Sequence, residues 1–204
     1  MRSGGSPWRE AAQSGFTLVE ILVAIVVLSF GVLGVVGMQA AALQSNHAAR
    51  DQSTAIALGR ELADMLRTNK TVSLQPTAAA NPYLGDFTAD TLPATTANCF
   101  TGACASPTLV AEFDIQQWML RVNAALPGAR VVVCFDDTPY AAATGRPQWD
   151  CNGASGQTLA IKIGWTQKSL DNEAAAPERT QGVGDGTGIG VPGVVLPVIP
   201  GSST

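Results

Sequence analysis

The sequence predicts an α+β protein in which one long N-terminal helix precedes a small head made of helix and sheet. A strongly apolar run over residues 16–38 continues into apolar side chains at three- and four-residue steps, which is typical of one face of a helix. Residues 159–165 alternate large apolar side chains with Ala, Lys and Gly, as a half-buried strand does. A capping hydroxyl followed by proline, at Ser106-Pro107, indicates the start of a second helix.

The long helix divides into two parts by composition. The apolar run over residues 16–38 is close to the ~20 residues that span a bilayer, so we expect a transmembrane helix there. Residues 39–70 carry an apolar stripe with charged residues on the other faces, and we expect them to continue the helix in amphipathic form. No proline interrupts the chain between Phe16 and Asn69, so the two parts can form one helix. Residues 1–15 precede it as a leader.

The rest of the chain predicts one head over residues 71–176 and a tail over residues 177–204. The second helix is expected to end at Pro127-Gly128, and residues 130–135 have the composition of a buried strand. Gly, Pro and Thr dominate the tail, which we expect to be flexible, although residues 194–199 are apolar enough to dock somewhere.

All four cysteines, Cys99, Cys104, Cys134 and Cys151, lie beyond the apolar helix. An even count in an exported segment predicts two disulfides. Their order in the chain favours the pairs Cys99–Cys104 and Cys134–Cys151, although three pairings are open. A four-cysteine zinc site is the competing interpretation, but its usual C-x2-C pairs are missing.

Composition argues against nucleic-acid binding and against catalysis. The net charge is −4 and no block of Lys or Arg occurs, so no nucleic-acid surface is expected. The single histidine, His47, falls just outside the membrane helix, away from any Ser-His-Asp or Cys-His arrangement in the head. Asp136-Asp137 is expected to be a solvated turn rather than a metal or acid–base pair. We therefore predict that the protein is not an enzyme and binds no metal or cofactor.

The junction between leader and helix, Gly15-Phe16-Thr17-Leu18-Val19-Glu20, is the most specific motif in the chain. At ~1.5 Å per residue, Glu20 lies about 6 Å into the helix, and a lone carboxylate in hydrocarbon costs several kcal/mol. A leader that ends in Gly, a following Phe and a Glu at this depth together resemble the type III signal of type IV prepilins. In that family a membrane peptidase cuts after the Gly and methylates the new N-terminus.

The resemblance implies cleavage between Gly15 and Phe16, with the apolar helix retained and Phe16 methylated. It also favours Glu20 as an assembly determinant, whose carboxylate pairs with the cationic N-terminus of a neighbouring subunit. A rival site exists at Ala40-Ala41-Ala42, where signal peptidase I would release a soluble protein. The rival leaves Glu20 and the Gly-Phe junction without a role.

The resemblance extends beyond the leader. The layout is similar to the pilin fold, in which the amphipathic half of the long helix packs on a small antiparallel sheet, here with one further helix. The chain looks like minor pilins of the PilV kind at residues 62–69, at residues 114–118, at Leu126-Pro127-Gly128 and at a late strand ending in Trp165.

This resemblance implies a minor pilin that prepilin peptidase processes, and that takes part in initiating type IV pili and is incorporated into them. It would sit in the inner membrane as a single-pass protein with a periplasmic head, and then in the cell-surface pilus. The implied partners are other minor pilins, the major pilin, prepilin peptidase and the inner-membrane assembly platform. Two alternatives stay open: a pseudopilin of a type II secretion system, and a membrane-anchored periplasmic enzyme.

Overall fold

The computed structural model describes residues 15–88, 91–153, 158–166, 180–181 and 190–201. The chain forms two compact units, Met1–Asn46 and His47–Thr204. Residues 1–14 of the predicted leader lie outside the described residues, as does half of the predicted tail. The glycine-rich segment Gly184-Asp185-Gly186 also lies outside the described residues.

In the first unit, the described chain is almost entirely the beginning of helix α1 (Leu18–Thr68). Every residue from 15 to 46 is exposed, including the large apolar side chains. The helix is long and apolar enough to cross a membrane. A helix that is apolar all round and has no protein neighbour is suited to lipid rather than to water.

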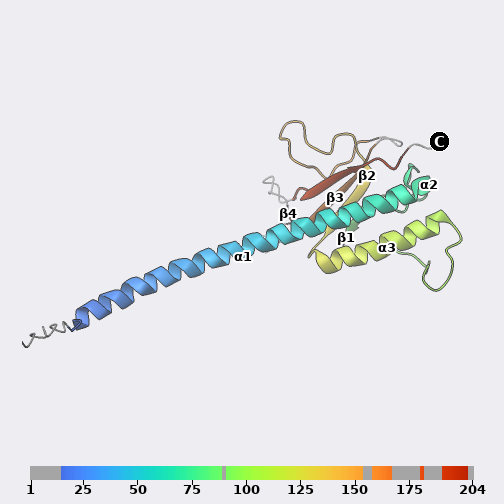
Figure 1. Ribbon diagram of the computed structural model, residues 1–204. Helices are drawn as coiled ribbons and strands as arrows, with labels where there is room; N and C mark the ends of the chain where they lie inside the picture. The colour runs from blue at the N-terminus through green and yellow to red at the C-terminus, as the bar shows by residue number, and fades with distance from the viewer. Residues whose placement is uncertain (1–14, 89–90, 154–157, 167–179, 182–189, 202–204) are drawn as a thin grey trace, which may run out of the picture. The chain divides into compact units, whose positions relative to one another are not determined.

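The second unit contains the end of α1 and all the other elements (Figure 1). The prediction of one long helix that ends near Asn69 is confirmed, because α1 spans 51 residues and ends at Thr68. The second predicted helix is α3, and Ser106 caps it by accepting a hydrogen bond from the Leu109 amide at 3.2 Å. The remaining elements are α2 (Lys70–Ser73), β1 (Gly85–Thr88), α3 (Pro107–Ala125), β2 (Arg130–Phe135), β3 (Leu159–Thr166), β4 (Thr180–Gln181) and β5 (Val194–Val198).

The strands form one antiparallel sheet with β3 at its centre, so the predicted fold class is confirmed. Strand β2 pairs with β1 on one side and with β3 on the other. The far edge of β3 is shared, because β5 pairs with its first part and β4 with its end. In this register Val131 lies opposite Ile163, and Val133 opposite Ile161. Side chains alternate between the two faces of a strand, so these four point to one face.

That face is covered by α1 and α3, and the core of the unit lies between them and the sheet. The two helices also contact each other, since Trp118 of α3 donates from its indole nitrogen to the Leu58 carbonyl of α1 at 3.0 Å. An ion pair joins Arg121 to Glu61 across the same contact. The core is built from Leu62 and Leu66 of α1, Ile115, Trp118 and Met119 of α3, Val131 and Val133 of β2, and Leu159, Ile161 and Ile163 of β3.

Two predictions for the strands are corrected. Strand β3 was expected to be half-buried, but every residue in it up to Trp165 is buried, because other parts of the chain cover both faces of the sheet. The prediction of a flexible tail does not hold for residues 194–198, because the apolar segment that was expected to be able to dock does so: it forms β5 and brings Val194 and Val198 into the core. The backbone groups at the edge of β3 supply the ladder that this apolar segment needs.

Gly59 of α1 marks where β5 packs on the helix. A Cβ atom there would clash with the Leu196 side chain of β5, and would lie 3.4 Å from Ile163 of β3. Glycine is unfavourable inside a helix, and here its missing side chain is what allows helix and strand to approach closely. The close packing of α1 on the strands therefore depends on this position.

We predict that Gly59→Leu destabilises the head by at least ~1 kcal/mol, because overpacking a tight contact outweighs the gain in helix propensity. The matched control is Ala57→Leu, two residues earlier on the same helix, where the side chain is exposed. Chemical unfolding of the full chain in detergent micelles measures the stability of both variants. Equal unfolding midpoints for the two would contradict the proposed packing role.

Candidate functional site

The first candidate site is the start of α1, where the predicted junction lies. The helix begins at Leu18, and the Thr17 carbonyl accepts hydrogen bonds from the amides of Glu20 at 3.1 Å and Ile21 at 3.3 Å. The Thr17 hydroxyl also accepts from the Glu20 amide at 3.3 Å. Thr17 is therefore the N-cap and Glu20 the third helical residue, which is the spacing of a capping box, and the structure shows the half of it that the Thr17 hydroxyl makes.

Sequence reasoning missed this role of Thr17, although the signal was present. A Thr followed three residues later by Glu, directly before an apolar run, is the sequence pattern of a capped helix start. Glu20 also lies in the first turn, where the positive end of the helix dipole favours a carboxylate. The structure thus gives Glu20 a local function in addition to the intermolecular one that we expect.

The cap decides the conformation of the predicted cleavage site. Gly15, Phe16 and Thr17 precede the helix, and Phe16 is 78% exposed. The bond between Gly15 and Phe16 is therefore open to an enzyme without unwinding a helical turn. The rival site at Ala40-Ala41-Ala42 lies inside α1, so cleavage there would first have to break helical hydrogen bonds.

His47 is exposed on α1. Tyr83 and Asp114 of the head have perturbed acid–base properties. Burial raises the pKa of the Tyr83 phenol to about 12, and burial also raises the pKa of the Asp114 carboxyl. A tyrosine with so high a pKa stays protonated at neutral pH, as a core residue does.

The second candidate site is formed by the cysteines. Cys99 is bonded to Cys104 and Cys134 to Cys151, with Cα–Cα distances of 5.2 and 6.2 Å. These are the pairs that the order in the chain favours. The first closes a turn before α3, where Phe100 packs edge-on against Phe113. All four sulfur atoms are used, so none offers the thiolate that the alternative zinc site would need.

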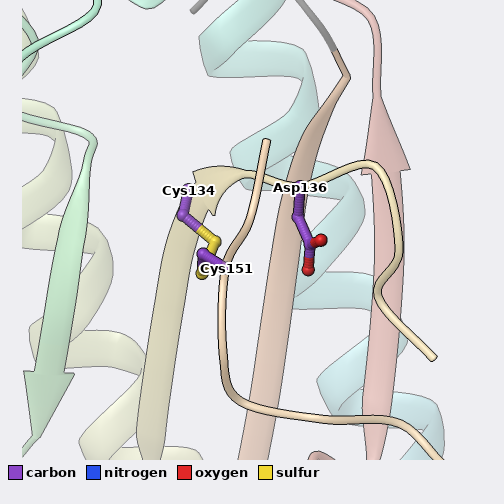
Figure 2. A group of neighbouring side chains, drawn as sticks. All are labelled: Cys134, Asp136 and Cys151. Atoms are coloured by element: carbon purple, nitrogen blue, oxygen red, sulfur yellow. A yellow bond between two sulfur atoms is a disulfide. The ribbon is translucent and has the colours of Figure 1, made fainter. Parts of the chain in front are cut away.

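Asp136 lies beside the second disulfide, just beyond the end of β2 (Figure 2). One of its carboxylate oxygens and the sulfur atoms of Cys134 and Cys151 all lie within 4.8 Å of one another. This spacing would suit a metal if the sulfurs were free. Both are instead bonded to each other, and Asp136 is paired with a buried lysine, so the cluster is a cross-link.

That lysine is Lys162, whose Nζ lies 2.5 Å from Asp136 Oδ2, with both side chains fully buried. The expectation of a solvated pair at Asp136-Asp137 is therefore wrong for Asp136, whereas Asp137 is exposed. The sequence carried one signal that was not used. A lysine between two isoleucines in a strand indicates either a solvent-facing position or a buried partner.

The comparisons with known proteins concern the first site. The family described as "Prokaryotic N-terminal methylation motif" matches residues 11–36, which include the Gly15–Phe16 junction and Glu20. Neither the curated proteins nor the solved structures gave a match. The chain therefore carries the N-terminal signal of type IV pilins and pseudopilins, joined to the α+β head described above.

We predict that breaking the Cys134–Cys151 bond lowers the free energy of unfolding by about 3 kcal/mol, the chain-entropy value for a loop of this length. The loop spans 17 residues, against 5 for the Cys99–Cys104 loop, which should contribute less. Peptide mapping under non-reducing conditions, followed by chemical unfolding of each cysteine-pair-to-serine variant, measures both points. Four free thiols in the exported protein, or a bound zinc ion, would contradict the assignment.

Proposed function

We propose that this chain is a minor pilin that prepilin peptidase cuts between Gly15 and Phe16 and methylates at Phe16. It takes part in initiating assembly of type IV pili and is incorporated into them. The observation that carries the proposal is the N-terminal methylation motif on an exposed apolar helix that continues without a break into an antiparallel head. Before assembly, the protein sits in the inner membrane as a single-pass protein with its head in the periplasm.

The state of the cleavage site supports this order of events. The scissile bond lies outside the helix and is exposed, whereas the apolar run after it is helical throughout. Removal of the leader therefore leaves the membrane helix intact. It also creates a new α-amino group at Phe16, a group with an ordinary pKa of about 8 that is largely protonated at neutral pH.

The new amino group provides the partner that Glu20 needs. A lone carboxylate a few residues inside hydrocarbon is costly, and it becomes favourable once a cation neutralises it. We propose that Glu20 of one subunit pairs with the Phe16 N-terminus of its neighbour, which also fixes the axial stagger between their helices. The neighbours are other minor pilins and the major pilin, and the inner-membrane assembly platform is the further partner.

A minor rather than a major role fits the head. Both disulfides are internal, and strands β3, β4 and β5 all follow the second one. Major pilins usually close a loop near the C-terminus with their cysteine pair. The internal pairs and the extra C-terminal segment therefore favour a specialised subunit.

The experiment that tests the proposal removes the gene and restores it with a tagged copy. We expect loss or reduction of surface pili in the deletion strain, recovery with the tagged copy, and small amounts of tagged protein in sheared pili. Normal piliation together with a defect in protein export would instead identify a pseudopilin of a type II secretion system. Turnover of a substrate by the purified protein would favour an enzyme.

We predict that processing leaves a mature chain beginning at methylated Phe16. Gly15→Val should block the cut, because the larger side chain crowds the position next to the scissile bond. Gly31→Val is the matched control, since nothing lies within 4 Å of a Cβ at Gly31. Intact-mass analysis decides the matter, and a mature chain that begins at Leu43 would instead establish the signal peptidase I site.

We predict that Glu20→Ala inserts into the membrane and loses its leader normally, yet is recovered much less in sheared pili and in pull-downs with partner pilins. The loss of the charge pair, rather than of side-chain volume, is the cause, so Glu20→Gln should behave like Glu20→Ala. Glu20→Asp keeps the charge and should retain more of the function. Co-purification of Glu20→Ala at the wild-type level, with normal piliation, would exclude the pairing role.

A further inference from the structure

We propose that Lys162 is a positioning residue for the second disulfide. It binds both ends of the loop over residues 136–153 and holds Cys134 near Cys151 whether or not the sulfur–sulfur bond has formed. The inference concerns the head alone and does not depend on the function proposed above.

The contacts of the ammonium group carry the argument. Lys162 lies in the middle of β3, and its side chain is fully buried. Its Nζ is 2.5 Å from Asp136 Oδ2, 2.5 Å from the Asp150 carbonyl and 3.4 Å from the Trp149 carbonyl. The two carbonyls accept hydrogen bonds from the ammonium group, and the Asp136 carboxylate is paired with it as an ion pair.

These acceptors flank the two cysteines. Asp136 comes two residues after Cys134, and Asp150 directly precedes Cys151. The sheet register places Cys134 opposite Ala160, and Val132 opposite Lys162. Cys134 and Lys162 therefore lie on the same face of adjacent strands, so the lysine cross-links the same two chain segments that the disulfide joins.

The loop that the lysine holds has a defined shape of its own. Inside it, the Gln148 amide donates to the Pro139 carbonyl at 3.0 Å and the Ala141 amide donates to the Arg146 carbonyl at 2.8 Å. A β-bridge joins Tyr140 to Pro147. These bonds organise the outer part of the loop, but they do not attach it to the sheet.

The base of the loop is packed tightly against the end of β2. The Gly153 amide donates to the Phe135 carbonyl at 2.9 Å, and a Cβ at Gly153 would lie 2.5 Å from the Asp136 nitrogen. Trp149 adds a second attachment, since its ring lies over the Arg130 guanidinium at 4.5 Å from the ring centroid. Asp86 in turn binds that guanidinium through two hydrogen bonds of 3.0 and 2.7 Å.

A buried ion pair needs a reason beyond stability. Taking an ammonium and a carboxylate out of water costs nearly as much as their attraction returns, and apolar residues of similar volume often serve stability equally well. The best-attested use of such a pair is to specify one arrangement among several. Here the arrangement specified is the loop on the sheet, and its chemical consequence is the proximity of two thiols.

The proposal is measurable as a disulfide equilibrium. In exchange with glutathione disulfide, the two protein thiols become one disulfide, and glutathione disulfide becomes two glutathione thiols. The equilibrium constant reports how closely the fold holds the two cysteines together. The Cys99–Cys104 pair, which makes no contact with Lys162 among the interactions described, is an internal control in the same molecule.

The first test titrates the full chain in detergent micelles with glutathione redox buffers and quantifies each disulfide by peptide mapping. Lys162→Met should lower the equilibrium constant of Cys134–Cys151 by about tenfold, since a hydrogen bond to a charged group is worth that much or more. The Cys99–Cys104 constant should not change. Lys70→Met, the same change at an exposed lysine, should alter neither. An unchanged Cys134–Cys151 constant in Lys162→Met would overturn the proposal.

The second test keeps Lys162 and removes the bond, using the Cys134→Ser/Cys151→Ser double variant. If the lysine holds the loop, the amides of Asp136 and Gly153, which attach the base of the loop to the strands, stay protected from hydrogen exchange, within about tenfold of the wild type. Exchange of these amides at the rate of an unstructured peptide would overturn the proposal. This measurement decides the question even if Lys162→Met unfolds the head and changes both disulfide constants.

Discussion

The head depends on burial of strand β3 on both faces. A strand buried on one side needs one covering layer, but β3 has to be covered twice, and different parts of the chain supply the two covers. The face with Ile161 and Ile163 is covered by α1 and α3. On the opposite face, the loop over residues 136–153 is anchored at Lys162. A head of this size has a small core, so it needs both layers to remove enough apolar surface from water.

The N-terminal site depends on interactions between residues that are only three or four positions apart in the sequence. Thr17 stops the helix, and that single cap leaves Gly15 and Phe16 outside it while Glu20 falls in the first turn. The same few residues therefore define the exposed bond, the carboxylate and the start of the apolar helix. The motif matched over residues 11–36 is likewise local in the sequence, and it was recognised in a chain that gave no match to curated proteins or solved structures.

The two ends of α1 meet different surroundings, and the sequence changes accordingly. In the first unit the helix is apolar all round, and in the second it buries a stripe that includes Ala55, Leu62 and Leu66. Gly59 interrupts that stripe at the point where β5 packs most closely. The later part of α1, which contributes to the core of the head, is therefore continuous with the earlier part, which carries the processing signal.

Local patterns determined the helices, the junction and the cysteine pairs. Periodicity, the proline-free stretch and the Ser106 cap depend on residues within a few turns of one another. They can therefore be recognised from the local sequence alone. The fold class followed from the same patterns, together with the resemblance of the junction to prepilin signals. The Cys134–Cys151 pair was favoured by its order alone, because nothing in the sequence shows which segments lie close together.

Only the tertiary structure decided what Lys162, Asp136, Gly59 and β5 do. A lysine that alternates with isoleucines looks solvent-facing, because in most sheets the polar face of such a strand is wet. Its burial follows from a loop that returns over the sheet, and the alternation within β3 carries no information about that loop. The sequence indicated that residues 194–199 could dock but not where, because a strand at a sheet edge is stabilised by a ladder whose other half, β3, comes some thirty residues earlier. Interactions over such separations depend on which surfaces meet, and this is the information that a single sequence lacks.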